Sequence, residues 1–351
     1  VMIQTYSTTI RRKEMDAVLT CMVDEKIGPG ELNAKLITQI KEFIKCDGAV
    51  ALRSPAIALK YALMSMGLEA NSKVMVSALA PAWQYQSLVS MGFEPLVLDV
   101  DEVNGLVNEQ IINEGIKQGG KVLLLHETEG ILPNLEEIVK LGVPIIEDIS
   151  QSAGSAFSMT GEDDSAQQQK MAGTFGVYSI LGLEERDVIT AGGGAVLISP
   201  GRREWIVLKK YVEEAPLTDL LPDINAALAW VQVKEFARNE KTRKELFAMY
   251  QQACFIGRHK MYARENENGS TACSFPLVLS SSYKDVKQYA AKKDIEINLA
   301  YENSIIALKD ELSETCIHAK SLYLRCVHIP LYPRLTHAES SKIIKVLSSL
   351  P

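Results

Sequence analysis

The feature that most constrains the fold is an alternation of short apolar runs with amphipathic segments through the middle of the chain. Six runs of strand length are nearly all apolar, as expected for parallel strands that helices cover on both faces: Lys73–Ala78, Glu94–Asp99, Lys121–His126, Pro144–Asp148, Val177–Leu181 and Ala195–Ser199. Segments with helical periodicity lie between them, at Ala56–Met66, Trp83–Met91, Leu135–Leu141 and Arg202–Val212. Such strand–helix alternation predicts a doubly wound α/β sheet.

The last third of the chain has a different organisation. A long segment with helical periodicity begins at Asp223 with an acidic first turn, and we expect it to link the sheet to a smaller α+β domain that starts near Arg238. The predicted boundaries are an N-terminal segment of residues 1–25 that packs on the small domain, a large sheet domain of residues 26–237, and a C-terminal domain of residues 238–351. The polar segment Ser158–Lys170 is predicted to be a mobile loop.

Composition narrows the class of partner. The 351 residues are 47% hydrophobic and 23% charged, which is typical of a soluble globular protein. The net charge of −7 and the absence of a Lys/Arg run argue against a nucleic-acid surface or a polybasic membrane patch. The apolar runs are too short to span a bilayer, and residues 1–18 lack the apolar core of a secretory signal. We therefore expect a cytoplasmic protein with neither nucleic acid nor membrane as partner.

The cysteines and histidines do not form a metal-binding pattern. The six cysteines are widely scattered with no CxxC pair, and the five histidines lack ligand spacing. This distribution favours reduced, buried thiols over disulfides or zinc. The sequence predicts no metal site.

Polar side chains at the ends of predicted strands mark a candidate site. Ligands of open α/β sheets gather at the carboxyl ends of the strands, and His126, Asp148 and Ser179 lie at or near such ends. Each also has a structural interpretation: the aspartate can cap a turn, the serine can be a small packing residue, and a lone histidine can be a structural group.

Four segments resemble one family over the whole chain. They are EPLVLDVD (94–101), IIEDISQSAG (145–154), INAALAWVQVKEF (224–236) and RCVHIPLYPRLTHAESSKII (325–344). They resemble the DegT/StrS-type aminotransferases, which are fold-type I pyridoxal-phosphate enzymes that act mainly on nucleotide-linked keto sugars. The resemblance implies a mostly parallel seven-stranded sheet domain with a smaller C-terminal α+β domain. A fold can host an altered site, so activity is a separate question.

The resemblance assigns roles to several residues. Asp148 matches the carboxylate that hydrogen-bonds the pyridinium nitrogen of the coenzyme and so keeps it protonated. Gln151 matches a residue near the 3-oxygen of the coenzyme ring, although it can equally be a satisfied loop amide. Ser179 matches the phosphate-binding serine, and His126 matches a histidine or similar residue near the site of relatives.

The phosphate-binding segment departs from the family pattern. Relatives carry Ser-Gly-Thr at a helix N-terminus, where free N–H groups and the helix dipole meet the anion. This chain has Ser54, Pro55 and Ala56, so one N–H donor and one hydroxyl are lost. Thr218 stands roughly where relatives present an asparagine from the neighbouring subunit. These changes predict weak phosphate binding.

The aromatic residue expected to stack on the coenzyme is also changed. Pro81 occupies the place near residue 81 where relatives carry this aromatic side chain, although Trp83 or Tyr85 could substitute for it.

The lysine that would bond the coenzyme covalently is absent from its segment. No lysine lies between Met171 and Leu208, and Glu184 stands five residues after Ser179, where the family's lysine belongs. With a different gap the position falls on Asp187, which is also acidic. A carboxylate cannot form an imine, and it would repel the phenolate and phosphate of the coenzyme. Glu184 can alternatively be an exposed residue of the charged string 184–187. We expect no covalent cofactor, and only weak binding of pyridoxal or pyridoxamine phosphate.

Three functional hypotheses follow. The first, which we favour, is a non-catalytic paralogue related to nucleotide-sugar or surface-polysaccharide biosynthesis that binds a nucleotide sugar or a partner enzyme. The second is a sugar dehydratase that holds pyridoxamine phosphate without a covalent bond, with Glu184 as base. The third is a residual aminotransferase, which the missing lysine disfavours. We expect a homodimer, or a heterodimer with an active paralogue, because relatives build each site at a dimer interface.

Overall fold

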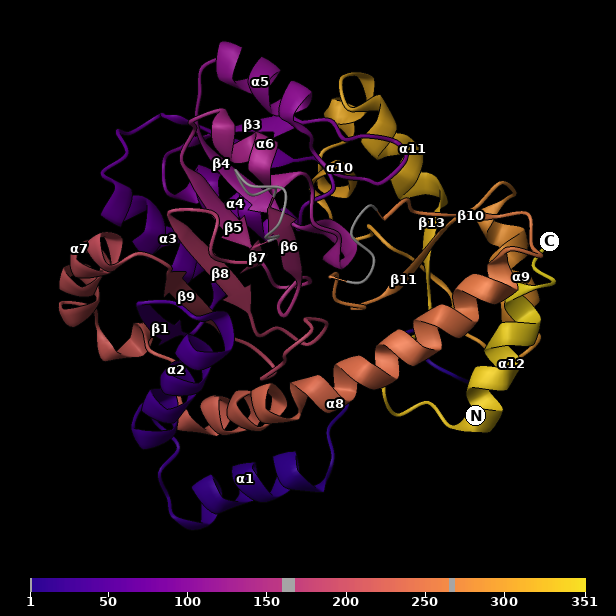
Figure 1. The fold of residues 1–351 in the computed structure, drawn as a ribbon, viewed down its shortest axis with the longest axis horizontal. Coiled ribbons are helices and arrows are strands. Elements are labelled where there is room, and N and C mark those ends of the chain that lie inside the picture. The colour runs from indigo at the N-terminus through magenta and orange to yellow at the C-terminus, as the bar shows by residue number, and fades with distance from the viewer. Residues whose placement is uncertain (1, 160–167, 265–268) are drawn as a thin grey trace.

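The computed structural model describes residues 2–159, 168–264 and 269–351, which form a large sheet domain and a smaller domain joined by one long helix (Figure 1). The large sheet has seven strands in the order β1-β9-β8-β5-β4-β2-β3. Only β9 runs antiparallel to its neighbours, so the predicted mostly parallel seven-stranded sheet is confirmed. The strands are β1 Gly48–Leu52, β2 Lys73–Ser77, β3 Glu94–Leu98, β4 Gly120–His126, β5 Ile145–Asp148, β8 Tyr178–Gly182 and β9 Ala195–Ser199.

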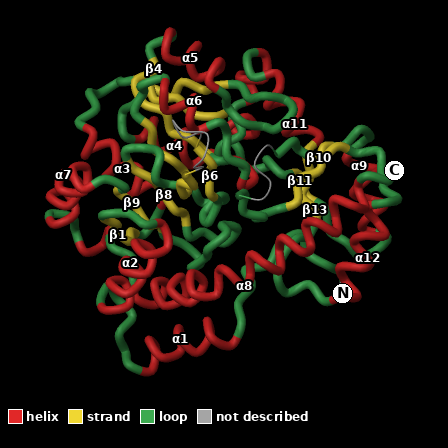
Figure 2. The backbone as a smooth tube through the Cα atoms, viewed as in Figure 1, coloured by secondary structure: helices red, strands yellow, loops and turns green. Residues whose placement is uncertain are grey.

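Two separate apolar cores explain why the strands are continuously apolar. Alternate residues of a strand face opposite sides, so Leu123 and Leu125 of β4 join one core while Val122 and Leu124 join the other. Helices cover both faces (Figure 2). One face packs against α3 (Pro55–Met66), α4 (Ala82–Ser90) and α7 (Arg202–Glu213), and the other against α2 (Glu31–Ile44), α5 (Glu109–Lys117) and α6 (Leu135–Lys140). β1 escaped the sequence analysis because a five-residue apolar run fits a strand and a buried helix equally.

The long helix α8 (Asp223–Cys254) belongs to both domains, as its position in Figure 1 shows. Its first half contributes Ala226, Ala229 and Phe236 to the core of the sheet domain. Its second half contributes Phe247 and Tyr250 to the core of the small domain. The helix thus fixes the two domains relative to each other.

The small domain contains an antiparallel sheet in the order β10-β11-β13-β12. Its strands are β10 Lys260–Met261, β11 Phe275–Val278, β12 Asn298–Leu299 and β13 Cys326–Ile329. Helices α9 (Tyr283–Ala291) and α12 (His337–Leu347) pack in its core, and α10 (Ile305–Leu308) and α11 (Ile317–Arg325) lie toward the large sheet. Short 3₁₀ turns lie at η1 Thr128–Gly130, η2 Leu217–Asp219 and η3 Asp310–Glu314.

The N-terminal segment contacts both parts of the molecule. Ile3 pairs with Ile295 of the small domain, and the hydroxyl of Thr5 donates to the carbonyl of Glu296. Helix α1 (Arg12–Val23) instead lies along α8, where its buried Glu14 accepts a hydrogen bond from Gln232. Within the predicted segment 1–25, contacts with the small domain extend to the start of α1, because Arg11 donates to the carbonyl of Pro333 and Arg334 donates to the carbonyl of Ile10.

The prediction of a mobile loop at Ser158–Lys170 is wrong at both ends of the segment. Residues 158–159 belong to β6 (Ala156–Met159) and residues 168–170 to β7 (Gln168–Met171), and the two strands pair antiparallel. Each of the two strands supplies hydrogen-bond partners for the backbone of the other. The polar sequence carries no apolar pattern from which this pairing could have been predicted. The middle of the predicted loop, residues 160–167, lies outside the described residues.

Membrane-spanning helices and metal-binding clusters are both absent from the described ranges. None of the helices there is both long and apolar enough to cross a membrane. In the same ranges, no cluster of three or more His, Cys, Asp or Glu side chains is arranged to hold a metal ion.

Candidate active site

A cavity of about 500 Å³ lies where the carboxyl ends of the parallel strands face the small domain. Five of the predicted site residues line it: Trp83, His126, Asp148, Gln151 and Glu184. The small domain contributes residues 273–274, 298–304 and His328, and the N-terminal segment contributes Thr5 and Tyr6. The cavity therefore needs both domains.

His126 and Asp148 meet because of the strand register. They are the last residues of β4 and β5, and the parallel pairing places them directly opposite each other. The Nδ1 atom of His126 lies 2.8 Å from Oδ2 of Asp148. Both side chains are almost fully buried, at 3% and 1% exposure.

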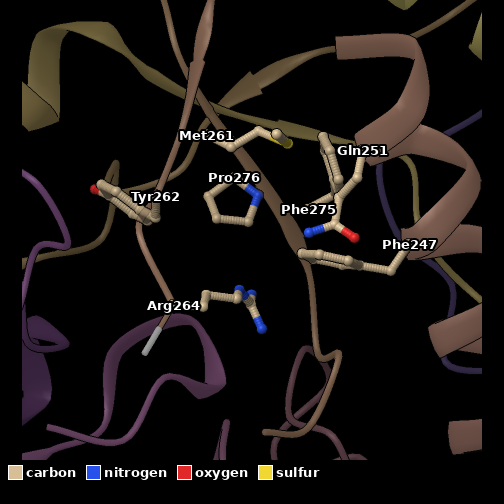
Figure 3. Close-up of a pocket in the computed structure, with 7 residues that line it drawn as sticks. All are labelled: Phe247, Gln251, Met261, Tyr262, Arg264, Phe275 and Pro276. Atoms are coloured by element: carbon tan, nitrogen blue, oxygen red, sulfur yellow. The ribbon is translucent and has the colours of Figure 1, made fainter. Parts of the chain in front are cut away.

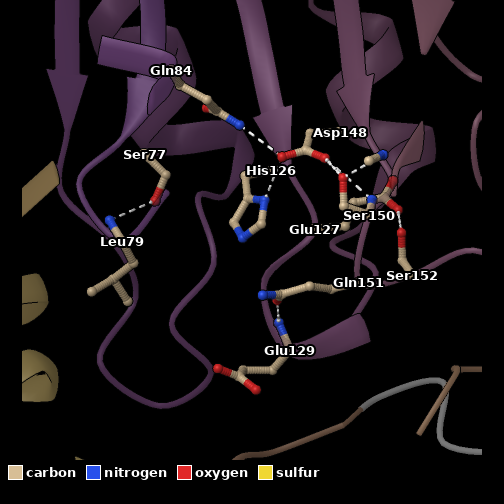
Figure 4. Close-up of polar contacts among 11 residues, drawn as sticks. Ser77, Leu79, Gln84, His126, Glu127, Glu129, Asp148, Ser150, Gln151 and Ser152 are labelled. Atoms are coloured by element: carbon tan, nitrogen blue, oxygen red, sulfur yellow. Dashed lines mark hydrogen bonds and ion pairs between the residues drawn. The ribbon is translucent and has the colours of Figure 1, made fainter. Parts of the chain in front are cut away.

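The carboxylate of Asp148 accepts four hydrogen bonds from the protein (Figure 4). Oδ2 accepts from His126 and, at 2.7 Å, from Nε2 of Gln84, which the sequence analysis missed. Oδ1 accepts from the hydroxyl of Ser150 at 2.5 Å and from its backbone N–H at 3.2 Å. A carboxylate has about four lone-pair sites, so the protein itself occupies the acceptor capacity of Asp148.

These contacts keep Asp148 ionised. Burial alone would raise the pKa of the Asp148 carboxyl, but His126 and the hydrogen bonds from Ser150 outweigh it and lower the pKa below its usual value. An ionised carboxylate only accepts hydrogen bonds, so Nδ1 of His126 carries the proton. The other ring nitrogen is Nε2. Figure 4 shows it pointing away from Asp148 with no hydrogen bond drawn to it.

Glu129 is a second buried acid in the cavity wall, and it too was missed by the sequence analysis. It has a left-handed backbone, with φ of 58°, which is a strained conformation for glutamate. Its N–H donates to Oε1 of Gln151 at 2.6 Å, and its carboxylate contacts the hydroxyl of Ser274 and lies 2.9 Å from Nε2 of His328. Burial would raise the pKa of Glu129, but His328 beside it lowers the pKa overall. The HETEG segment at the end of β4 could have identified it by the strand-end argument.

The two acidic candidates for the lysine position lie differently. Glu184 is exposed at the rim of the cavity, and its Oε1 accepts a hydrogen bond of 3.4 Å from the N–H of Gly194. Asp187 is half-buried, and its Oδ2 accepts from the N–H of Glu184 at 2.8 Å. Burial, together with the charges of Asp148 and Glu184, raises the pKa of Asp187 to about 8. Asp148 and Asp187 thus have their pKa values shifted in opposite directions.

Three predicted residues lie outside the described wall of this cavity: Ser54, Ala56 and Ser179. Ser54 caps α3, its hydroxyl accepting from the N–H of Ile57, and Ala56 is the second residue of that helix. Ser179 is fully buried, and its hydroxyl donates to the carbonyl of Gly173 at 2.9 Å. In this structure Ser54 and Ser179 have structural partners.

The cavity wall is strongly acidic. Six side chains of its described lining carry carboxyl groups: Glu129, Asp148, Glu184, Glu185, Asp187 and Glu302. No lysine belongs to that described lining, and its arginine, Arg186, lies 3.0 Å from Glu302. The described lining thus holds more acidic than basic side chains, and His126, His328 and Arg186 each pair with one of the six acids.

A smaller cavity of about 80 Å³ lies within the small domain, between α8 and the strands β10 and β11 (Figure 3). Its lining is Phe247, Gln251, Met261, Tyr262, Arg264, Phe275 and Pro276. It is far smaller than pockets that hold metabolites.

Known proteins support one fold for this chain. Residues 8–348 match the family model of the DegT/DnrJ/EryC1/StrS aminotransferase family. Among solved structures, an aminotransferase from Psychrobacter cryohalolentis is similar with a TM-score of 0.84, 17% identity, and coverage of 97% of this chain and 96% of that chain. The aminotransferase TlmJ from Streptoalloteichus hindustanus has a TM-score of 0.85 and 15% identity, over 99% of this chain and 97% of that chain.

A third similar structure is a dehydratase. It is a variant of the GDP-4-keto-6-deoxymannose-3-dehydratase ColD with bound GDP-perosamine, with a TM-score of 0.81 and 16% identity, over 98% of this chain and 100% of that chain. At these identities the structural likenesses establish the fold alone. Members of this fold thus include proteins of more than one activity.

Proposed function

Because the chain belongs to the DegT/DnrJ/EryC1/StrS aminotransferase family, we propose that it is a sugar-aminotransferase relative without transaminase activity that binds a nucleotide-linked sugar. In this proposal the cavity between the domains holds the sugar, and the protein acts in nucleotide-sugar or surface-polysaccharide biosynthesis. The GDP-perosamine bound by ColD is the precedent within this fold for a nucleotide-sugar ligand.

The observation that carries this proposal is the saturation of Asp148. A coenzyme pyridinium N–H needs a free carboxylate lone pair, yet Gln84, His126 and Ser150 already donate four hydrogen bonds to this side chain. Displacing one of them would leave a buried polar group unpaired, which costs about 1–3 kcal/mol. The site is therefore preorganised without the coenzyme ring.

Two further features support loss of the coenzyme. No lysine lies between Met171 and Leu208, so the segment that follows β8 offers no amine for a covalent bond. Pro55 removes a backbone donor at the start of α3, where the resemblance places the phosphate. The residues of this cavity do not fit pyridoxal phosphate.

A second candidate, a dehydratase that holds pyridoxamine phosphate without a covalent bond, is favoured by one observation. The pKa of Asp187 is raised to about 8, by burial and in part by the charge of Asp148, whereas the pKa of Asp148 is itself lowered. Pairs of carboxyl groups separated in this way are typical of acid–base sites. Saturation of Asp148 and the weakened phosphate site count against this candidate as they do against the transaminase.

Coenzyme titration separates the candidates. Purified protein is titrated with pyridoxal phosphate and with pyridoxamine phosphate, followed by absorbance, equilibrium dialysis and borohydride reduction with peptide mapping. A lysine-bearing member of the family is the positive control. We expect no protein-linked absorbance band, no reduced adduct in residues 171–208, and no saturable binding of either coenzyme at micromolar concentration.

The other outcomes are decisive. A stoichiometric adduct at Lys170, Lys209 or Lys210 would show that a displaced lysine has taken over and would refute the proposal. Tight binding of pyridoxamine phosphate alone would refute the proposed loss of the coenzyme and favour the dehydratase candidate. Binding of UDP-glucose or GDP-mannose with neither coenzyme bound would support the proposed function.

A further inference from the structure

Glu129 combines two features that are unfavourable for folding. Its backbone is left-handed, with φ of 58° and ψ of 24°, a conformation that glycine adopts freely and that strains a residue with a Cβ atom. Its carboxyl group is 1% exposed, and although burial would raise its pKa, His328 beside it lowers the pKa overall, so the acid is buried in its ionised form. A buried ion pair adds little net stability. Stability alone therefore does not explain this residue.

The main chain of Glu129 is held from both domains. Its N–H donates to Oε1 of Gln151 at 2.6 Å, and its carbonyl accepts from the guanidinium of Arg264 at 3.2 Å. The next residue, Gly130, lies so close to the small domain that an added Cβ atom would come within 2.5 Å of the carbonyl oxygen of Thr271. Strained conformations persist where the surroundings fix them in this way, and they cluster at functional sites.

The carboxylate of Glu129 is directed to His328 on β13. Both of its oxygens lie 2.9 Å from Nε2 of His328, and one of them also accepts from the hydroxyl of Ser274. An ionised carboxylate only accepts hydrogen bonds, so Nε2 carries a proton. In the part of the chain that the structure describes, Nε2 makes all hydrogen bonds of this ring. The other ring nitrogen, Nδ1, has no partner among those residues.

His328 is the more accessible of the two histidines that acids hold in the described cavity lining. Its side chain is 25% exposed, whereas that of His126 is 2% exposed. Asn298, which lies opposite His328 in the paired strands, also lines the cavity and donates to the hydroxyl of Thr5. His328 thus belongs to a polar strip on the small-domain side of the cavity.

We propose that His328 binds a hydroxyl group of the ligand through Nδ1 and that Glu129 is the positioning residue that fixes the ring. A hydroxyl group both donates and accepts, so it pairs with Nδ1 in either protonation state of that nitrogen. A hydrogen bond to one ring nitrogen determines the orientation and the role of the other. This inference rests on the proposed function, because it assigns ligand-binding roles within the same cavity.

The positioning role is tested without a ligand. Protein labelled with ¹⁵N at its five histidines is compared with His328→Gln, in which the Nε2–H resonance of His328 is identified by its loss from the ¹H–¹⁵N spectrum. In Glu129→Gln this resonance should move upfield, because an amide oxygen is a weaker acceptor than a carboxylate. Circular dichroism verifies the folding of each variant. Absence of a His328 N–H resonance in the wild type, or an unmoved resonance in Glu129→Gln, would overturn the positioning role.

The ligand contact is tested by acylation with diethylpyrocarbonate, which modifies unprotonated imidazole nitrogens, followed by peptide mapping. His328 should react faster than His126. UDP-glucose or GDP-mannose at ten times its Kd should slow the reaction of His328 about tenfold, because only the unliganded protein exposes Nδ1. His337, which is exposed on α12 outside the described lining, is the control and should react equally with and without the nucleotide sugar.

Affinity measurements complete the test. His328→Gln should weaken nucleotide-sugar binding about tenfold, since glutamine can still donate to Glu129 but lacks the second ring nitrogen, and one lost hydrogen bond has this effect. Glu129→Gln should weaken binding in the same direction while leaving His328 in place. His337→Gln is the matched control and should bind as the wild type does.

The failures of the two proposals are distinguishable. Unchanged affinity in His328→Gln, or undiminished acylation of His328 when a nucleotide sugar is bound, would overturn this inference and leave the proposed function standing. If neither nucleotide sugar binds the wild type at millimolar concentration, the proposed function and the ligand contact are both refuted.

Discussion

Ser179 provides the sharpest contrast between a ligand-binding role and a structural one. The resemblance matches it to a phosphate-binding serine, whereas the structure buries it completely and directs its hydroxyl to the carbonyl of Gly173 at 2.9 Å. That carbonyl belongs to a turn whose N–H groups at Gly173, Phe175 and Gly176 donate to the buried carboxylate of Glu147. The hydroxyl therefore adds a hydrogen bond to a turn that the carboxylate of Glu147 also holds.

Ser179→Ala should lower the stability of the sheet domain without changing ligand affinity. Losing a typical hydrogen bond costs about 1 kcal/mol, and leaving a buried carbonyl unpaired raises the cost toward about 2 kcal/mol. The assay is urea unfolding followed by tryptophan fluorescence. All three tryptophans, Trp83, Trp205 and Trp230, lie in the sheet domain or in the half of α8 that packs on it, so the signal reports on this domain.

The matched control is Ser199→Ala. Ser199 is also fully buried, at the end of the neighbouring strand β9, and its hydroxyl donates to the carbonyl of Gly201 at 3.1 Å. Both variants should shift the urea midpoint by similar amounts and leave the binding of inorganic phosphate and pyridoxamine phosphate as in the wild type. A Ser179→Ala protein with an unchanged midpoint but weakened phosphate binding would refute the structural role.

Three other predictions address the loop, the pH dependence and the assembly. Glu184→Lys should form no borohydride-stable coenzyme adduct, because residue 184 is exposed at the rim and Asp148 stays saturated; a stoichiometric adduct in peptide mapping would contradict this. Stability should fall as pH rises from about 4 to about 8, because the folded-state pKa of Asp187, about 8, exceeds its unfolded value of about 4 and the folded state binds the extra proton. In Asp187→Asn the urea midpoint should decline less over this pH range than in the wild type. Parallel curves of midpoint against pH for the two proteins would contradict the contribution assigned to Asp187. Light scattering at micromolar concentration should report a dimer, and a monomer would refute both the homodimer and the heterodimer alternative. We expect the dimer interface to bury more than about 2,000 Å² through Ser54–Trp83 and Thr218–Asp223, near Leu217, whose side chain is 74% exposed.

The pattern of apolar residues along the chain was enough to predict six strands of the large sheet and one pair of neighbouring site residues. The six predicted strands lie within one residue of the observed ones, because strands covered on both faces must be apolar on both faces. The ends of parallel strands share one edge of the sheet, so His126 and Asp148 could be placed together before their contact was known. The absent lysine is likewise a property of the sequence alone.

Only the tertiary structure decided which partners these residues have. Gln84 reaches Asp148 from α4, and His328 of the small domain reaches Glu129 across 199 positions of sequence. The same structure turns Ser179 toward Gly173 and brings Asp187 beside Asp148. Periodicity fixes which face of an element is buried, but it does not fix which distant element arrives there. Because hydrogen-bond saturation and pKa depend on those neighbours, the chemistry of this cavity was decided by the packing of the two domains.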